Sequence, residues 1–413
     1  MMKILFVNNY LSYPLDSGGS IATDTYLNSL GNVSELHLLL LLKNMVAQCA
    51  IDEAIQYYKN FCKTVEIHLI EDINRPKSRK EKLYRYFLGD PIRGDWSETA
   101  ADIIRKNIRK NKIDLLWAGR THVGKYLRIA RELNIFKILT THNVESKLVY
   151  QRILSSNIKY HIKSWIVWWD IKRLEKKVTK LADLITTISK EDHKYYRKMR
   201  GPKSVLYLPF AIKENLIKES EKDLTEEIEN RICFIGNLSW FPNIDAAKYL
   251  IKTIMPLVWQ KSKNIICYIV GKDPPKDLVK MNSEKIKITG AVPSVVPYIK
   301  QAAIIVLPLR MGSGIKIKLL ESMALEKPVI TTTIGAHGIP IENGKHAIVA
   351  DTPKKIADSI IKLLGDKSLR KELSKSGKQL ALENFSEQSL RKSIGEILNL
   401  VHNEKSKRYY SHV

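Results

Sequence analysis

The stretch IIVLPLRMGSGIKIKLLESMALEKPVITTTIGAHG, residues 304–338, predicts the fold of the chain around it. Residues 304–307 are continuously apolar, which is typical of a strand buried in a parallel sheet. The glycines of residues 312–314 predict a turn, and the pattern that follows predicts a helix ending near Glu326. A second short strand is predicted at 328–332. A strand, a glycine turn and a helix in this order present unpaired backbone N–H groups to an anion.

Charged residues in the predicted helix indicate the class of ligand. Lys316 and Lys318 lie in its expected first turns, where the helix dipole favours acidic side chains, so they are understandable if they face phosphate. Glu321 lies seven residues after Gly314, on the same expected face, with Lys318 one turn before it. A carboxylate for two ribose hydroxyls beside cations for phosphate indicates a sugar nucleotide. The alternative is an ordinary amphipathic helix with an apolar stripe.

The stretch resembles the donor-binding segment of family 4 glycosyltransferases, which are retaining enzymes of the GT-B type. The usual signature of that family is Glu-x7-Glu followed by Ala-Met-Ala-x-Gly-x-Pro-Val. Glu321 matches the second glutamate and is followed by Ser-Met-Ala-Leu-Glu-Lys-Pro-Val at 322–329. Ser313 stands where the first glutamate is usual. A branch of the family with Gly-Gly-Gly-Thr-Arg-x-Lys-x-x-Glu shows the same departure, and residues 312–318 resemble it.

Length and composition indicate a soluble protein of two domains. The 413 residues exceed what one hydrophobic core organises, and 44% hydrophobic with 27% charged residues is an ordinary globular composition. The apolar runs are too short to cross a bilayer, and the start MMKILFVNN does not read as a signal peptide. The four cysteines lack metal-type spacing. We therefore expect reduced thiols and a cytoplasmic location.

The net charge of +25 indicates a polyanionic partner, because 68 Lys and Arg face 43 Asp and Glu. No helix-turn-helix, zinc-finger or RNA-recognition signature accompanies it, so nucleic acid is not expected. Bases and aromatics alternate in the stretch 75–93, which fits either an anionic membrane surface or a solvated helix face. Trp165, Trp168 and Trp169 also have basic flanks, but we expect them to pack against the sheet. We predict peripheral binding to the inner face of the cell membrane.

The first half of the chain alternates predicted strands and helices. Gly18 and Gly19 follow the first strand and its loop and begin a helix, without the Gly-x-Gly-x-x-Gly of a dehydrogenase-type site. His142 ends a later strand within Thr-His-Asn-Val-Glu. By resemblance, the two glycines contact the donor diphosphate, and His142 contacts the donor sugar near the reacting carbon. The alternatives are a tight turn and a hydrogen-bonded structural histidine, while Glu145 fits a site residue or a helix cap equally well.

The second half opens with a strand that leads into a glycine loop at Gly236. Most relatives hold the diphosphate with an arginine and a lysine in this loop, where this chain has Asn237 and Pro242, followed by Asn243. The missing charge is expected from Arg310, Lys316 and Lys318. The expected boundaries are a first domain at 1–211, a polar linker at 212–230, a second domain at 231–385, and a C-terminal helix with a basic tail at 386–413 that crosses back to the first domain.

We therefore predict an α/β fold of the GT-B class, with two Rossmann-like doubly wound domains facing a central cleft. The resemblance implies a retaining hexosyltransferase that moves a sugar from a nucleotide-diphosphate sugar to an acceptor hydroxyl, in surface polysaccharide or glycolipid assembly. Its expected partners are this donor, a saccharide or lipid-linked saccharide acceptor and an anionic membrane surface, with no metal and no cofactor. The alternatives are a catalytically silent GT-B binding or scaffold protein and a sugar-nucleotide epimerase. The predicted catalytic residues are His142 and Glu321, and the predicted donor-binding residues are Gly18, Gly19, Gly236, Asn237, Asn243, Arg310, Ser313, Gly314, Lys316, Lys318 and Glu321.

Overall fold

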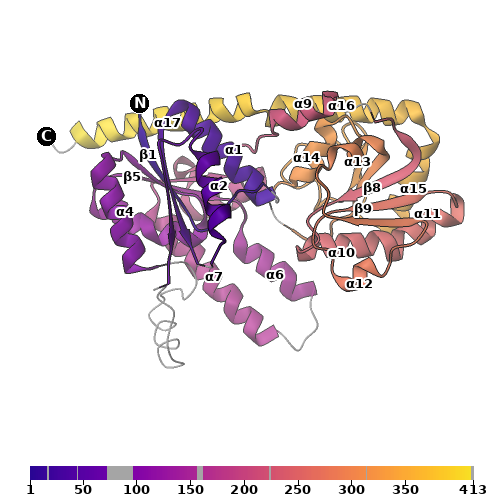
Figure 1. Cartoon of the computed structure of the whole chain (residues 1–413), viewed down its shortest axis with the longest axis horizontal. Coiled ribbons are helices and arrows are strands. Elements are labelled where there is room, and N and C mark those ends of the chain that lie inside the picture. Colours follow the sequence, from indigo (N-terminus) through magenta and orange to yellow (C-terminus); the bar gives the residue numbers. More distant parts are fainter. Residues whose placement is uncertain are drawn as a thin grey trace. The chain divides into compact units, whose positions relative to one another are not determined.

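The computed structural model divides the chain into two compact units (Figure 1), Met1–Pro209 with Leu390–Val413, and Phe210–Ser389. Ser313 and the basic stretch 75–93 lie outside the residues that the structure describes. No helix in the described part of the chain is long and apolar enough to cross a bilayer. The described residues are 1–15, 18–43, 45–71, 96–155, 161–222, 225–312 and 314–410.

The first unit contains one parallel sheet of seven strands in the order β3-β2-β1-β4-β5-β6-β7. Its central strands β4 and β5 are buried along their whole length, and β4 is continuously apolar, as is typical of a buried parallel strand, whereas β5 also contains Lys137, Thr140 and Thr141. The strands are β1 (Lys3–Asn8), β2 (Glu35–Leu42), β3 (Thr64–Leu69), β4 (Leu115–Ala118), β5 (Phe136–Thr141), β6 (Leu184–Thr187) and β7 (Val205–Tyr207).

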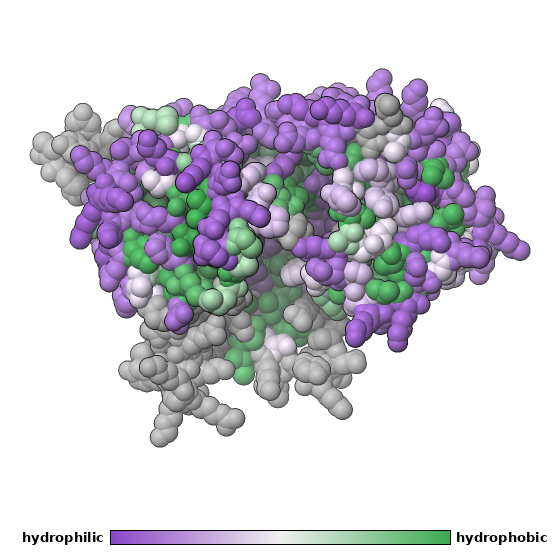
Figure 2. All heavy atoms as spheres, viewed as in Figure 1, coloured by the Kyte–Doolittle hydropathy of each residue, from purple (hydrophilic) through white to green (hydrophobic). Residues whose placement is uncertain are grey.

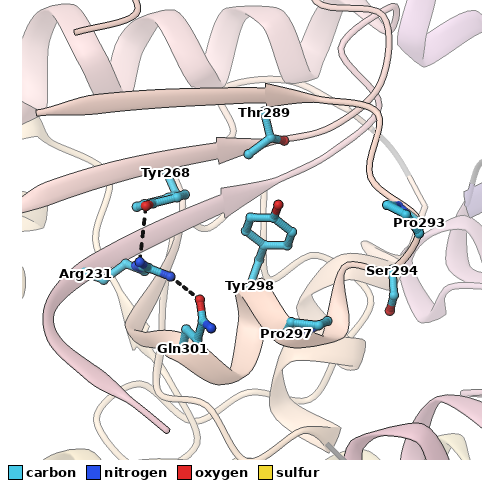
Figure 3. A pocket seen from close by; sticks show the side chains of 8 residues that line it. All are labelled: Arg231, Tyr268, Thr289, Pro293, Ser294, Pro297, Tyr298 and Gln301. Carbon is cyan, nitrogen blue, oxygen red and sulfur yellow. Dashed lines mark hydrogen bonds between the residues drawn. The ribbon is translucent and has the colours of Figure 1, made fainter. Parts of the chain in front are cut away.

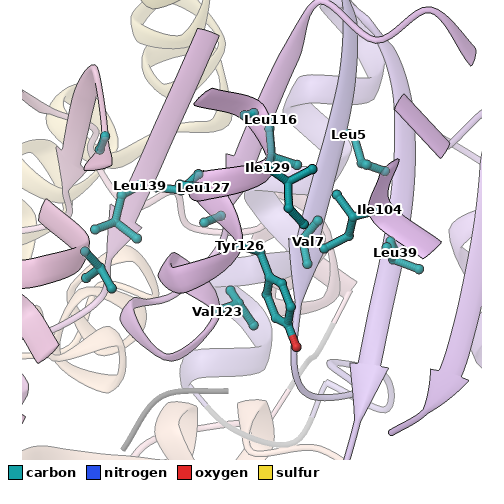
Figure 4. Packing of buried hydrophobic residues seen from close by; sticks show 14 of the residues in the cluster. Leu5, Val7, Leu39, Ile104, Leu116, Val123, Tyr126, Leu127, Ile129 and Leu139 are labelled. Atoms are coloured by element: carbon teal, nitrogen blue, oxygen red, sulfur yellow. The ribbon is translucent and has the colours of Figure 1, made fainter. Parts of the chain in front are cut away.

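Helices cover this sheet, and the core lies between the two layers. In Figure 4, apolar side chains of β1, β4 and β5 form one cluster with Ile104 of α4, Leu127 of α5 and Tyr126 of the short helix η1. The helices of the first unit are α1 (Gly18–Val33), α2 (Gln48–Tyr58), α4 (Glu98–Asn111), η1 (Thr121–Tyr126), α5 (Leu127–Glu132), α6 (Glu145–Ser155), α7 (His161–Leu181), α8 (Lys190–Arg200), η3 (Pro202–Ser204) and most of α17 (Glu387–Tyr410).

The second unit repeats this plan with a parallel sheet of six strands in the order β10-β9-β8-β11-β12-β13. Its strands are β8 (Ile228–Ile235), β9 (Ile266–Val270), β10 (Ile286–Gly290), β11 (Ala302–Leu307), β12 (Val329–Thr331) and β13 (Ile348–Val349). Its helices are α9 (Glu214–Lys222), α10 (Phe241–Tyr249), the π-helical turn η4 (Leu250–Ile254), α11 (Met255–Lys261), α12 (Lys276–Val279), α13 (Val296–Gln301), α14 (Ile317–Ala324), α15 (Pro353–Gly365) and α16 (Lys367–Phe385).

These two parallel sheets with the strand order of Rossmann-like domains confirm the predicted fold class. Two segments differ in detail from the expectation. The range 212–230 contains helix α9. Two hydrogen bonds hold this helix to the rest of the second unit: the Ser294 hydroxyl donates to the Glu219 carboxylate at 2.5 Å, and the Lys300 ammonium donates to the Ser220 carbonyl at 2.8 Å. A polar composition does not distinguish a linker from a surface helix held in this way. The helix α17 continues to Tyr410, so most of the expected basic tail is helical.

The chain enters and leaves the second unit at adjacent points. Ile212 forms a parallel bridge with Ser386, and its N–H donates to the Phe385 carbonyl at 2.7 Å. Two residues later, the Glu214 N–H donates to the carboxylate of Glu387 at 3.3 Å. The second unit is therefore one continuous segment whose two ends are paired by hydrogen bonds, while the first unit is built from two separate segments.

Candidate active site

The carboxyl ends of the central strands position the candidate residues in each unit. In the first sheet the strand order changes direction between β1 and β4, and in the second between β8 and β11. The loops that leave two such strands diverge, so ligands of open parallel sheets bind at these points. Gly236 follows β8 directly, and Arg310 lies three residues after β11. In the first unit, Arg120 follows β4 in the same way.

The start of α14 differs from its prediction in one respect. Gly312 and Gly314 have φ angles of 131° and 68°, so the backbone before the helix is left-handed there, and α14 begins only at Ile317. Gly314 is therefore outside the helix, and the expected helix face shared by Gly314 and Glu321 does not exist. Lys316 is the residue before the helix. Its ammonium donates to the Gly314 carbonyl at 2.7 Å, and its side chain makes no capping hydrogen bond to the first turn.

Lys318 lies against the glycine loop that follows β8. Its ammonium donates to the side-chain oxygen of Asn243, and the amide nitrogen of Asn243 donates to the Asn237 carbonyl at 2.7 Å. A Cβ atom on Gly236 would lie 2.6 Å from the Lys318 nitrogen and 2.9 Å from Asn243 Cγ. Only glycine permits this approach of the ammonium to the loop. The structure thus brings together four of the predicted donor-binding residues from two distant stretches of sequence.

The charges of Lys318 and Glu321 influence one another in a desolvated setting. Burial lowers the pKa of Lys318 to about 7, with Lys316 acting in the same direction and Glu321 opposing it. Burial raises the pKa of Glu321 to about 7, with Lys318 and Lys213 opposing it. Within the described residues, no hydrogen bond reaches the Glu321 carboxylate. The Glu321 carboxylate can therefore accept hydrogen bonds from ligand hydroxyls. An anion bound beside Lys318 would favour the charged form of this lysine.

Two predicted residues of the second unit have other partners. The Arg310 guanidinium donates from Nε to Asp245 at 3.0 Å and lies 4.4 Å from the ring centre of Tyr249, so a phosphate would compete with this ion pair. The side-chain oxygen of Asn237 accepts from the N–H and hydroxyl of Ser239 at 2.9 and 2.7 Å. The Asn237 side chain therefore stabilises its own loop, and only the backbone carbonyl of Asn237 contacts Asn243 among the hydrogen bonds described above.

His142 lies in the first unit, directly after β5, and its side chain is buried. Burial and the nearby Arg120 lower the pKa of His142 to about 3, although a hydrogen bond with the backbone of Gly119 acts in the opposite direction. Its ring meets the edge of Tyr26 with the ring centres 6.1 Å apart. His142 is therefore a neutral imidazole, which can exchange hydrogen bonds with a hydroxyl but carries no charge for phosphate.

Arg120 is a candidate that was not predicted from the sequence. Its guanidinium carbon lies 3.9 Å above the ring of Tyr10, and a Cβ atom on Gly19 would lie 2.9 Å from Arg120 Nη2. The Tyr10 hydroxyl donates to the Gly19 carbonyl at 2.8 Å. Arg120 Nε is buried and has no hydrogen-bond partner among the described residues. The helix α1 begins at Gly18, so Arg120 and the first turn of α1 together favour an anion.

Sequence alone contained one signal for Arg120. It is the second residue after a continuously apolar strand, next to a glycine, which is a common position for ligand contacts in parallel sheets. Glu145 begins α6 in the same unit. Burial raises the pKa of Glu145, Arg120 lowers it and Asp192 raises it further. Arg120 therefore acts electrostatically on both His142 and Glu145.

A cavity of about 520 Å³ in the second unit lies away from these residues (Figure 3). Arg231, near the start of β8, donates to the Tyr268 hydroxyl at 3.1 Å and also to Gln301, which directly precedes β11. None of the candidate residues lines this cavity, whose other walls are formed by Thr289, Pro293, Ser294, Pro297 and Tyr298. The cavity is therefore separate from the candidate site.

Comparison with known proteins bears on the same part of the chain. Residues 229–366 match the family described as glycosyl transferases group 1, and this range contains all the candidate residues of the second unit. An uncharacterized 44.6 kDa protein from the cps region of Klebsiella pneumoniae is 22% identical over 95% of this chain and 99% of its own length.

Solved structures resemble the whole chain at low sequence identity. Sucrose-phosphate synthase from Thermosynechococcus elongatus superposes with a TM-score of 0.71 at 13% identity, covering 98% of this chain and all of that one. The Anabaena protein HepE in complex with UDP and glucose gives 0.62 at 12% identity, covering 97% and 100% of the two chains. The second unit therefore carries a match to the glycosyl transferases group 1 domain, in a chain that has the two-domain fold of GT-B glycosyltransferases.

Proposed function

We propose that this chain transfers a sugar from a nucleotide-diphosphate sugar to an acceptor hydroxyl with retention of configuration. The observation that supports this most is the start of α14. A first turn that its N-cap residue Lys316 does not cap, two lysines and a carboxylate without a hydrogen bond in the described part of the chain lie together at the carboxyl end of the sheet. Lysines at a helix N-terminus oppose the helix dipole, and a bound diphosphate would reverse that unfavourable interaction.

Each residue has a defined part in this proposal. Lys318, Lys316 and the first amides of α14 hold the diphosphate, and Glu321 accepts hydrogen bonds from the ribose. Asn243 holds the Lys318 ammonium beside the loop at Gly236. The neutral His142 exchanges a hydrogen bond with a hydroxyl of the transferred sugar. The main contribution to catalysis is then electrostatic, because preorganised cations and helix amides stabilise the charge that develops on the leaving diphosphate.

The proposed acceptor is a saccharide carried on a lipid at the inner face of the cell membrane, in surface polysaccharide or glycolipid assembly. The charge of +25 supports an anionic surface as a partner. The full-length similarity to a protein of a cps region supports the proposed role in surface polysaccharide assembly. The predicted contribution of the basic stretch 75–93 is tested by vesicle sedimentation after Arg79, Lys80, Lys82 and Arg85 are changed to glutamine. Binding to anionic vesicles at low salt should weaken in this variant.

The donor is tested with a panel of sugar nucleotides, by thermal shift and by release of the nucleoside diphosphate without acceptor. At least one sugar nucleotide should raise the melting temperature and be slowly hydrolysed. Glu321→Gln should weaken both responses, by about tenfold to a hundredfold in donor affinity and hydrolysis, while Glu342→Gln, which changes an exposed carboxylate paired with Lys345, should leave them unchanged. If a sugar nucleotide binds but is neither hydrolysed nor used to glycosylate any acceptor, the result would favour the catalytically silent binding protein. A panel without any response would contradict the proposal.

A further inference from the structure

An exposed aromatic surface lies on the paired helices α6 and α7 of the first unit. We name it the tryptophan face and define it by Tyr150, Leu154, Trp165, Ile166 and Trp169. Leu154 is 67% exposed, and the other four are between 39% and 44% exposed. Figure 2 shows hydrophobic atoms at the surface where Figure 1 places α6 and α7. A contiguous apolar patch on a soluble unit indicates a binding surface.

The tryptophan face is ordered by contacts among its own rings. Tyr150 and Trp165 have ring centres 5.9 Å apart, and Trp165 meets the edge of the partly buried Trp168 at 5.5 Å. The expectation that the tryptophans pack against the sheet is therefore wrong for Trp165 and Trp169. The reason is the length of α7, because its second half supplies Leu174 and Val178 to the core, whereas the tryptophans lie in its first half.

Cations lie directly beside these rings. The Lys172 ammonium is 4.7 Å from the ring centre of Trp168, and the Arg173 guanidinium is 5.4 Å from that of Trp169. Tryptophans with adjacent lysine and arginine are typical of surfaces at the boundary between water and lipid headgroups. A symmetric pair of copies would instead bring two sets of Lys172 and Arg173 into one interface without a matching set of acids among the described residues of the tryptophan face, so like charges disfavour a dimer through this face.

We propose that the tryptophan face docks the first unit on an anionic lipid bilayer, with the aromatic rings at headgroup level and Lys172 and Arg173 on the lipid phosphates. This inference rests on the proposed function, because it assigns the surface that would bring the chain to a lipid-linked acceptor. It requires no spanning segment and predicts reversible binding that salt weakens.

The test uses the full chain with vesicles of phosphatidylcholine alone or mixed with phosphatidylglycerol, sedimented at low and high salt. The wild type should bind only the anionic vesicles, and less at high salt. The variant Trp165→Ser/Ile166→Ser/Trp169→Ser should lose at least tenfold in vesicle affinity. The variant Lys172→Gln/Arg173→Gln should bind more weakly and with a smaller salt dependence. The matched control is Trp240→Ser, which removes a 55% exposed tryptophan from the second unit and should bind as the wild type does.

Three results would overturn the inference. The wild type could ignore anionic vesicles at low salt, the triple variant could bind them as well as the wild type, or light scattering could show a dimer that the triple variant abolishes. Circular dichroism establishes that each variant is folded. Donor hydrolysis is measured on the same preparations, so loss of turnover in every sample contradicts the proposed function, and intact turnover without vesicle binding contradicts the docking surface alone.

Discussion

The carboxyl ends of the two sheets hold charged groups in different ways. In the second unit, Lys318 and Glu321 come from one turn of α14, and Asn243 orients the lysine. In the first unit, Arg120 and His142 follow two different strands, and Arg120 rests on an aromatic ring. A constellation from one helical turn is visible as a motif in the sequence. A constellation assembled from separate strand ends becomes visible only when the strand order is known.

The two cations also differ in chemistry. Arginine stays charged at every physiological pH, whereas lysine loses its proton readily when it is buried. The pKa of Lys318 is lowered by burial, so the second unit should bind anions in a pH-dependent way and the first should not. The following variants sharpen or contradict this comparison.

The largest effect is expected when Lys316 and Lys318 are both changed to methionine. Charged hydrogen bonds are worth roughly 1.5–3 kcal/mol each, so the pair should cost on the order of a hundredfold or more in affinity for a nucleoside diphosphate. Affinity for the corresponding nucleoside should change little. Isothermal titration with both ligands measures the difference, and the single variants show which lysine contributes more. Equal losses for the two ligands would mean that neither lysine contacts phosphate.

Glu321→Ala should come next. Removing a carboxylate that accepts ribose hydroxyls costs roughly 1.5–3 kcal/mol, or about tenfold to a hundredfold in donor affinity and turnover. The loss should be the same for nucleoside and nucleoside diphosphate, in contrast to the lysine variants. A 2′-deoxy, 3′-deoxy nucleotide should bind the wild type and the variant alike. Unchanged donor affinity and turnover would remove Glu321 from the site.

The pH dependence of diphosphate binding should be smaller, about tenfold between pH 7 and pH 8.5. The Lys318 ammonium binds phosphate, so the affinity for diphosphate is highest below the lowered pKa of Lys318 in the free protein. The affinity falls as the pH rises above this value, until the pH reaches the higher pKa that Lys318 has in the complex. The carboxylate of Glu321 binds ribose, so affinity also falls as pH decreases through its raised pKa. Titrations in buffers of different ionisation enthalpy should show proton uptake on binding above pH 7. Lys318→Met should abolish the decrease in affinity at alkaline pH. If the decrease persists in this variant, Lys318 is not its cause.

Arg120→Met should have the smallest effect, a loss of about tenfold in kcat/KM, which is the lower end of what one charged hydrogen bond contributes. Arg120→Lys should recover only part of it, because a lysine cannot reproduce the planar contact with Tyr10. The variant should also raise the pKa of His142, since Arg120 lowers it, and NMR titration of the imidazole would show this shift. An unchanged histidine pKa would contradict the electrostatic coupling between the two residues.

Much of the fold could be predicted because buried parallel strands are continuously apolar. Runs such as Leu36–Leu42 indicate strands on their own. The start of α14 was less predictable, because the glycine turn does not show in sequence that the helix begins only at Ile317, after the left-handed Gly314. The link from Lys318 to Asn243 was also beyond the sequence, since it joins residues 75 positions apart. The position of Arg120 beside Gly19 similarly depends on β4 pairing with β1.

The paired ends of the second unit affect how the molecule is made. Residues 1–209 are synthesised before the second unit, but the segment that completes their unit, Leu390–Val413, is synthesised after it. The second unit is a continuous segment closed by the bridge between Ile212 and Ser386, so it can fold before the final helix exists. The same closure makes residues 210–389 an exchangeable cassette. A related segment with equivalent ends could replace it without altering the first unit's two-part chain.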